Sequence, residues 1–146
     1  MHILAIDPGY TTGFCGVEVE DGFEVLLSEE TSYATTFKAF HDLLHGMYVL
    51  PDKGIPLVPE IVICENFRLM PHKALTQIGK VFPSARLIGA LEYIMWSQGL
   101  EGPVLLEPSV KARVKILPEH SQIVSGSEHK KDAYQLARYY YVTKLR

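Results

Sequence analysis

The sequence predicts a mixed α/β fold, in which helices cover the faces of a β-sheet. Two short apolar runs end abruptly in a carboxylate, at Asp7 and at Glu65. The segment after Asp7 alternates with the period of a strand, whereas three later segments have the spacing of amphipathic helices. Three strands in succession, followed by helix, strand, helix, strand and helix, are typical of such a sheet.

The first elements are expected to form an antiparallel meander. Ile3–Asp7 is apolar enough for a buried strand, and Phe14–Glu20 shows the period-two pattern of a half-buried strand. Asp21-Gly22 predicts a two-residue hairpin turn, after which Phe23–Leu27 returns as a third strand.

The middle of the chain combines a helix with a central strand. Thr35–Val49 has helical spacing, and Pro51–Pro59 is rich in proline and glycine, which predicts a loop. Glu60–Asn66 contains four consecutive apolar residues, as expected for a strand buried on both faces. The residues expected to share one side of the helix are Phe37, Phe40, Leu44 and Met47.

The last third of the chain predicts three helices and one strand. Ser84–Gln98 carries an apolar stripe, and Pro83 argues against a helix that continues unbroken from Lys73. The other expected elements are a strand at Val104–Leu106, a short helix at Val110–Lys115 capped by Ser109, and a helix at Ser127–Leu145.

The composition is that of an ordered globular protein. The chain has 146 residues, of which 47% are hydrophobic and 21% charged, so we expect one domain spanning residues 1–146. No apolar run reaches the about 18–20 residues that span a bilayer, and the N-terminus lacks a signal-peptide pattern. Cys15 and Cys64 lie in apolar runs, which predicts buried reduced thiols and a cytoplasmic protein without a membrane partner.

Charge is distributed unevenly along the chain. Residues 1–65 contain 2 Lys/Arg and 11 Asp/Glu, whereas residues 66–146 contain 12 and 6, although the net charge is only −3. This asymmetry is consistent with a polyanionic partner for the second half, and equally with an ordinary solvated surface.

The strongest functional signal is a set of acidic residues. If the strands that end in Asp7 and Glu65 are neighbours, both carboxylates emerge at the same end of the sheet. His129 and Asp132 are three residues apart on the apolar face of the last helix, which would point them toward the sheet. Carboxylates with an imidazole suit Mg²⁺ or Mn²⁺ better than a structural Zn²⁺. A pair of such ions can promote phosphodiester hydrolysis.

Four motifs in order carry a resemblance to a known family. They are Ile-Asp7-Pro-Gly with Gly13 beyond it, Ile-Cys-Glu65, Pro108-Ser-Val-Lys111 and His129-Lys-Lys-Asp132-Ala. With these motifs the chain resembles the RuvC-type Holliday junction resolvases of the RNase H-like superfamily, and among them the bacteriophage-encoded branch. The resemblance implies a five-stranded mixed sheet in the order 3-2-1-4-5 flanked by helices, and a homodimer. It also implies paired, symmetric, Mg²⁺-dependent nicks in four-way DNA junctions that leave 5′-phosphate ends, with two ions per site, Mn²⁺ as a substitute and no small-molecule cofactor.

The resemblance also assigns expected roles to residues. Asp7, Glu65 and Asp132 match the acidic metal ligands of the family, and His129 matches a position that is Asp or His among its members. Lys111 matches a catalytic lysine near the scissile phosphate.

DNA contacts are expected from an aromatic residue and from basic residues. Phe67 matches an aromatic that wedges against unpaired bases at the crossover, and its alternative role is to close the core. The candidate DNA-binding residues besides Phe67 are Arg68, His72, Lys73, Lys80, Arg86, Arg113, Lys115, Lys130 and Lys131.

Two other functions fit the same residues, and a third does not fit the length of the chain. The same metal site would serve a nuclease that cuts flaps, forks or structured RNA. A junction-binding module without catalysis would keep the ion for structure alone. A nucleotide-binding protein of the actin and sugar-kinase type also opens on a strand that ends in Asp, but it needs two large lobes, for which 146 residues leave no room.

Overall fold

A computed structural model of the chain describes residues 1–67 and 82–146. They form a five-stranded sheet in the order β3-β2-β1-β4-β5, which confirms the expected order. β1 pairs antiparallel with β2 and parallel with β4, so the sheet is mixed as predicted. The strands are β1 His2–Asp7, β2 Thr11–Glu18, β3 Glu24–Ser32, β4 Ile61–Glu65 and β5 Val104–Leu106.

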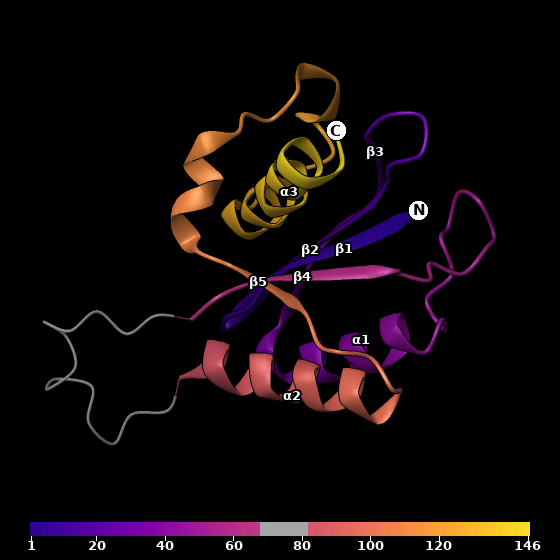
Figure 1. Ribbon diagram of the computed structural model, residues 1–146, viewed down its shortest axis with the longest axis vertical. Coiled ribbons are helices and arrows are strands. Elements are labelled where there is room, and N and C mark those ends of the chain that lie inside the picture. The colour runs from indigo at the N-terminus through magenta and orange to yellow at the C-terminus, as the bar shows by residue number, and fades with distance from the viewer. Residues whose placement is uncertain (68–81) are drawn as a thin grey trace, which may run out of the picture.

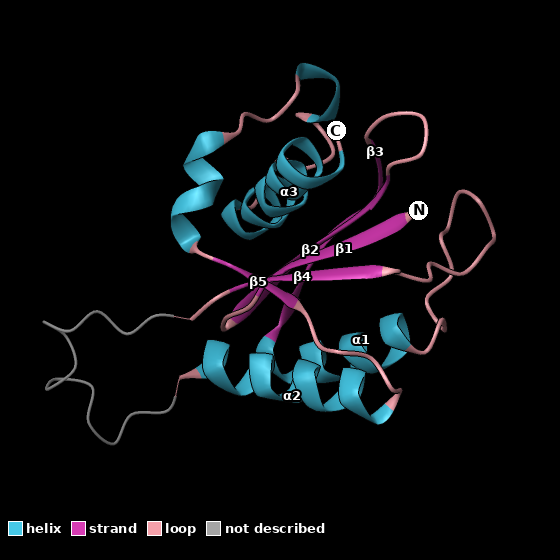
Figure 2. Cartoon of the chain, viewed as in Figure 1, coloured by secondary structure: helices cyan, strands magenta, loops and turns pink. Residues whose placement is uncertain are grey.

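Helices cover both faces of this sheet (Figure 1). α1 (Tyr33–Leu44) and α2 (Pro83–Ser97) lie on one face, and α3 (Glu128–Tyr140) lies on the other (Figure 2). The short helix η3 (Pro108–Arg113) follows β5 and packs beside α3. Two further short turns, η4 (Pro118–His120) and η5 (Tyr141–Leu145), flank α3 in sequence.

The central strand supplies both hydrophobic cores. Leu4 and Ile6 of β1 face α1 and α2, whereas Ile3 and Ala5 face α3, because successive side chains of a strand point to opposite faces. With both faces covered, all of Thr12–Val17 in β2 is buried. The expectation that this strand is only half-buried is therefore wrong.

Two boundaries in the first half differ from expectation. Glu18 pairs with Glu24, so five residues join β2 to β3 and the predicted two-residue turn is wrong. α1 begins at Tyr33, two residues before the predicted start, and ends at Leu44. Met47 consequently lies outside the helix and is 61% exposed, and the buried side of α1 consists of Thr36, Phe40 and Leu43.

The helices of the second half begin where their first residues dictate. α2 starts at Pro83, which tolerates the first turn because its missing N–H would have no helical partner there. The predicted break at Pro83 is thus the helix start. Ser127 caps α3 by accepting a hydrogen bond from Lys130 N at 3.3 Å. The prediction that Ser109 caps the short helix is wrong, since it lies inside η3, which follows Glu107.

Cys15 and Cys64 are buried and unpaired, which confirms that both are free thiols. Among residues 1–67 and 82–146, no helix has the length and apolar character needed to span a membrane.

Candidate metal centre

Three carboxylates from distant parts of the chain converge at one edge of the sheet. β1 and β4 run parallel with Ile6 opposite Cys64, so Asp7 and Glu65 end adjacent strands side by side. Asp132 reaches them from the first turns of α3. One oxygen from each carboxylate lies within 4.8 Å of the others, and no other set of three potential ligands in the described parts of the chain comes so close.

Gly13 allows α3 to approach this edge. It pairs with Asp7 across the β1–β2 ladder, next to the backbone of His129. A Cβ at Gly13 would lie 2.0 Å from the carbonyl oxygen of His129, a distance that no side chain tolerates. Glycine at this position therefore sets how closely α3 docks and brings His129 and Asp132 to the end of β1.

Lys111 lies between two of the three carboxylates. Its Nζ is 2.5 Å from Glu65 Oε2 and 2.6 Å from Asp132 Oδ2, and its side chain is 18% exposed. Burial by itself would lower the pKa of Lys111, but its hydrogen bonds to Asp132 and Glu65 outweigh burial and raise it. Lys111 is therefore fully charged at neutral pH.

Asp7 is the most buried of the acidic groups, with 10% of its side chain exposed. Burial, followed by the nearby charge of Glu65, raises its pKa to about 6. Its hydrogen bond with His129 Nδ1, at 3.1 Å, and the charge of Lys111 act in the opposite direction without cancelling that rise. The three carboxylates thus outweigh the single buried ammonium, and their ionised form favours a further cation.

The donor set fits a hard divalent cation. Clustered carboxylate oxygens are the ligands that Mg²⁺ and Mn²⁺ prefer. Cys64 precedes Glu65, but burial raises the pKa of its thiol far above the usual range, so it offers no thiolate for zinc.

The structure places the other predicted site residues at different distances from this centre. His129 is outside the three-carboxylate group and contacts it through Asp7, with 44% of its side chain exposed. Phe67 follows β4, is partly buried, and its ring lies 5.0 Å from that of Phe82.

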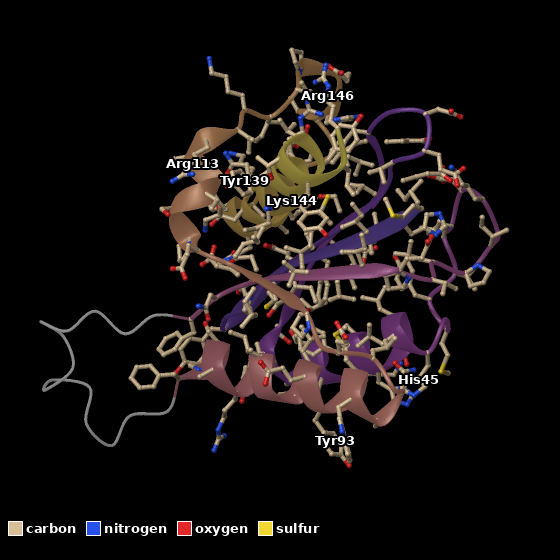
Figure 3. The ribbon with its side chains drawn as sticks, viewed as in Figure 1. His45, Tyr93, Arg113, Tyr139, Lys144 and Arg146 are labelled. Carbon is tan, nitrogen blue, oxygen red and sulfur yellow. The ribbon has the colours of Figure 1, made fainter. Side chains whose placement is uncertain are left out.

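The predicted basic contacts are divided between described and undescribed parts of the chain. Arg113 projects from η3 (Figure 3), and Lys115 is exposed just beyond it. Lys130 and Lys131 lie in the first turn of α3, where Lys131 Nζ is 3.2 Å from Glu128 Oε1. The remaining predicted contacts before α2, namely Arg68, His72, Lys73 and Lys80, lie outside the described residues.

Sequence reasoning missed the contacts that hold the loop after Asp7. Ser84 Oγ donates to the carbonyl oxygen of Pro8 at 2.7 Å, and Tyr33 N donates to that of Tyr10 at 2.8 Å. The loop is thereby fixed to the starts of α2 and α1, while Tyr10 stays 76% exposed. An aromatic residue after the Pro-Gly turn is visible in the sequence, but its anchors are remote in the chain.

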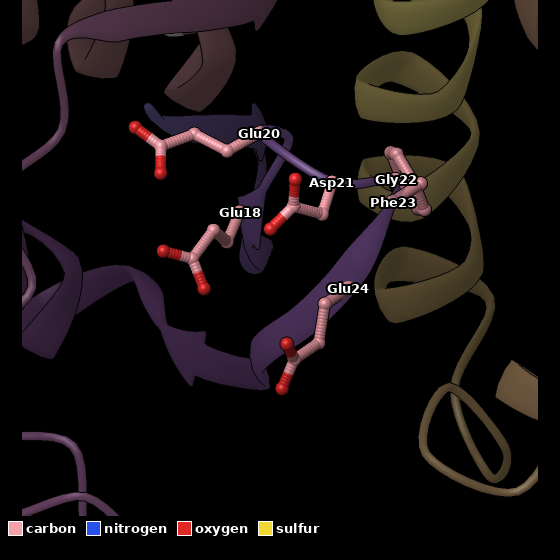
Figure 4. Close-up of a pocket in the computed structure, with 6 residues that line it drawn as sticks. All are labelled: Glu18, Glu20, Asp21, Gly22, Phe23 and Glu24. Carbon is pink, nitrogen blue, oxygen red and sulfur yellow. The ribbon is translucent and has the colours of Figure 1, made fainter.

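A second group of acidic residues lies at the opposite end of β1, around the β2–β3 connection (Figure 4). Glu20 is 3.2 Å from the Met1 amine, and Lys53 is 3.4 Å from Glu24. Glu20 and Glu24 are exposed and already have cationic partners, and among the described residues no three acidic groups at this end come within 4.8 Å of one another.

Comparisons with known proteins support the fold. No protein-family model matches the sequence, and no curated protein matches it. The structure of T. thermophilus RuvC in complex with Holliday junction substrate superposes with a TM-score of 0.64 at 17% sequence identity. The match covers 99% of this chain and 96% of that one. The fold is RuvC-like. Its five-stranded mixed sheet in the order 3-2-1-4-5, flanked by helices, is the fold that was predicted.

Proposed function

We propose that this protein is a metal-dependent DNA endonuclease that resolves four-way junctions by paired symmetric nicks leaving 5′-phosphate ends. The observation that carries the proposal is the convergence of Asp7, Glu65 and Asp132 within 4.8 Å at the end of the two central strands. The RuvC-like fold around this centre supports junction DNA as the substrate, since the superposed RuvC is bound to a Holliday junction.

The residues of the centre divide into metal ligands, a positioning group and a phosphate contact in this mechanism. Asp7, Glu65 and Asp132 would hold two Mg²⁺ ions, which when bound supply water activation and leaving-group stabilisation, and which Mn²⁺ would replace. His129 orients the Asp7 carboxylate through its Nδ1 contact, with ligation by His129 itself remaining a prediction. Lys111 is near enough to the carboxylates to stabilise charge that develops on a phosphate bound there.

The surface next to the centre supports DNA as the ligand. Arg113 and Lys115 on and after η3, with Lys130 and Lys131 on α3, provide the cationic groups for phosphates. Phe67 would stack on an unpaired base, with Phe82 as its support. In this proposal residues 1–146 form a single nuclease domain that acts in the cytoplasm. The protein would belong to the bacteriophage-encoded branch of these resolvases.

A homodimer is needed for paired nicks, and α2 offers the face for a second copy. Tyr93 and Trp96 are 67% and 71% exposed, and Tyr93 points away from the sheet (Figure 3). Gly89 and Ala85, one and two turns earlier, are small exposed residues, and a Cβ at Gly89 would meet nothing within 4 Å. An antiparallel pair of α2 helices that cross at Gly89 would place Ala85 of one copy against the ring of Tyr93 in the other.

The decisive experiment incubates the protein with an end-labelled four-way junction and Mg²⁺, beside flap, fork, linear duplex and RNA duplex substrates. Paired nicks in the junction alone are the expected result. Equal cutting of flaps, forks or RNA would contradict junction selectivity and favour the broader nuclease. Tight binding of an intact junction would contradict catalysis and favour the silent binding module.

Two variants test the parts of this proposal that concern assembly and stacking. Tyr93→Glu should convert a dimer to a monomer in light scattering and turn paired nicks into single ones. Phe67→Ala should weaken binding of closed junctions by about 1–3 kcal/mol and of pre-opened junctions by less. Equal losses on both substrates would assign Phe67 to the core instead.

A further inference from the structure

The two sides of the candidate metal centre are already occupied by different cationic or polar groups of the protein. On one side, His129 Nδ1 contacts Asp7 Oδ2 at 3.1 Å. On the other, Lys111 Nζ contacts both Glu65 and Asp132 at 2.5 and 2.6 Å. The ammonium group thus lies where a cation shared by Glu65 and Asp132 would have to bind.

We propose that Lys111 is a resident counter-ion of the Glu65–Asp132 side and must leave it before a divalent cation binds there. This inference rests on the proposed function, because it takes the three-carboxylate group as the metal site. It predicts that the site loads unevenly. The Asp7 side takes the first ion, because within the described parts of the chain the one polar contact of the Asp7 carboxylate is the half-exposed His129 imidazole, and the Glu65–Asp132 side opens only when Lys111 moves.

The location of Lys111 makes such an exchange feasible. Its side chain is 18% exposed, so it is enclosed enough to compete strongly for the carboxylates but is not sealed in the core. It extends from η3, a helix of six residues, and a lysine has four rotatable side-chain bonds through which its ammonium group can swing away. Once displaced, the ammonium would be free to contact a phosphate bound beside the carboxylates, so one side chain would serve the empty and the loaded site in turn.

Electrostatics fixes the direction of the competition. A unit positive charge 2.5 Å from a ligand oxygen repels an incoming cation, and removing it without adding another charge should strengthen metal binding. Lys111→Met keeps the length and apolar stem of the side chain but removes the charge. Lys111→Arg keeps the charge and should keep the competition.

The first experiment measures Mn²⁺ binding to the full chain without DNA, by calorimetry and by the electron paramagnetic resonance signal of free Mn²⁺. Lys111→Met should bind the weaker Mn²⁺ ion on the order of tenfold more tightly than the wild type. Lys111→Arg should stay close to the wild type. Lys38→Ala is the matched control, because it removes a lysine that lies 2.5 Å from Asp42 at the surface of α1. Unchanged or weaker binding in Lys111→Met would overturn the proposal.

A second readout uses the wild type and does not depend on the folding of a variant. Lys111 should be protected from an amine-acylating reagent in metal-free buffer and become reactive when Mg²⁺ is added, as detected by peptide mass spectrometry. Lys38 should label equally in both conditions.

The outcomes separate this inference from the proposed function. Mn²⁺ binding with Lys111 equally protected would overturn the counter-ion role alone. No Mn²⁺ binding at all would overturn both. Exposure of Lys111 by Mg²⁺ in a protein that leaves every junction intact would support the exchange and contradict only the nuclease.

Discussion

The two ends of β1 carry acidic groups of similar charge but different construction. At the start of the strand, Glu20 and Glu24 are 72% and 63% exposed, and their partners are the N-terminal amine and Lys53. At its end, the side chains of Asp7 and Glu65 are 10% and 18% exposed and meet Asp132 at a single point. Exposed carboxylates are stabilised by water, whereas buried ones need a cation. Burial and convergence, and not the number of acidic residues, therefore distinguish the candidate metal centre.

The largest expected effect lies in catalysis at the buried end. Asp7→Asn keeps the shape of the side chain but removes its charge. Loss of a residue that only supports a metal ligand lowers activity about 10- to 100-fold, and loss of a ligand itself should lower the rate of cutting further. Junction binding should be retained, because Asp7 is buried and makes no surface for DNA. Cleavage and gel-shift titrations measure the two effects. Glu18→Gln at the other end of β1 serves as the control, and full activity in Asp7→Asn would contradict the metal assignment.

The same substitution should stabilise the metal-free protein at neutral pH. The pKa of Asp7 is about 6 in the folded state and 3.8 ordinarily. Between these two pH values Asp7 is protonated in the native state but ionised in the unfolded state. The contribution of Asp7 to stability is thus fully present below about pH 4 and is lost as the pH rises through 6. The loss amounts to about 3 kcal/mol at pH 7.5.

Urea unfolding with a chelator tests this sign. Asp7→Asn should exceed the wild type in free energy of unfolding at pH 7.5, and the gap should close at pH 4. A gap that is the same at both pH values would show that the ionisation of Asp7 is not its cause.

The close approach of α3 to β2 gives the next largest effect. Gly13→Ala places a methyl group against the His129 carbonyl, and we expect a loss of about 1–3 kcal/mol together with weaker Mn²⁺ binding. Gly89→Ala on the open face of α2 is the matched control, and should gain up to about 1 kcal/mol from helix propensity. Both are measured by urea unfolding at concentrations where the wild type is monomeric. Equal stability changes in the two variants would contradict the steric reason.

The smallest effects are expected at the exposed end. Lys53→Ala removes the contacts with Glu18 and Glu24, at 3.7 and 3.4 Å, and should change the free energy of unfolding by less than about 1 kcal/mol. Mn²⁺ affinity and junction cleavage should not change. A clear loss of metal binding in this variant would remove the distinction between the two ends.

The sequence by itself determined the features that depend on local pattern. Apolar runs that end in Asp7 and Glu65 predicted two strands with acidic ends, and the spacing of His129 and Asp132 predicted their helical face. The expected start of the last helix at Ser127 agrees with the structure, in which Ser127 caps α3. The order of the sheet came from the family resemblance, and the structure confirms it.

Only the tertiary structure decided the features that depend on contacts between distant residues. The β2–β3 turn and the end of α1 differ from prediction because pairing and packing override local propensity. The position of Lys111 between Glu65 and Asp132 follows from packing of η3 against α3, and the fit of α3 at Gly13 depends on a neighbour more than a hundred residues away. Side-chain burial and charge balance are set by such long-range contacts, and so the electrostatics of the site, including the raised pKa of Asp7, emerges only once the chain is folded.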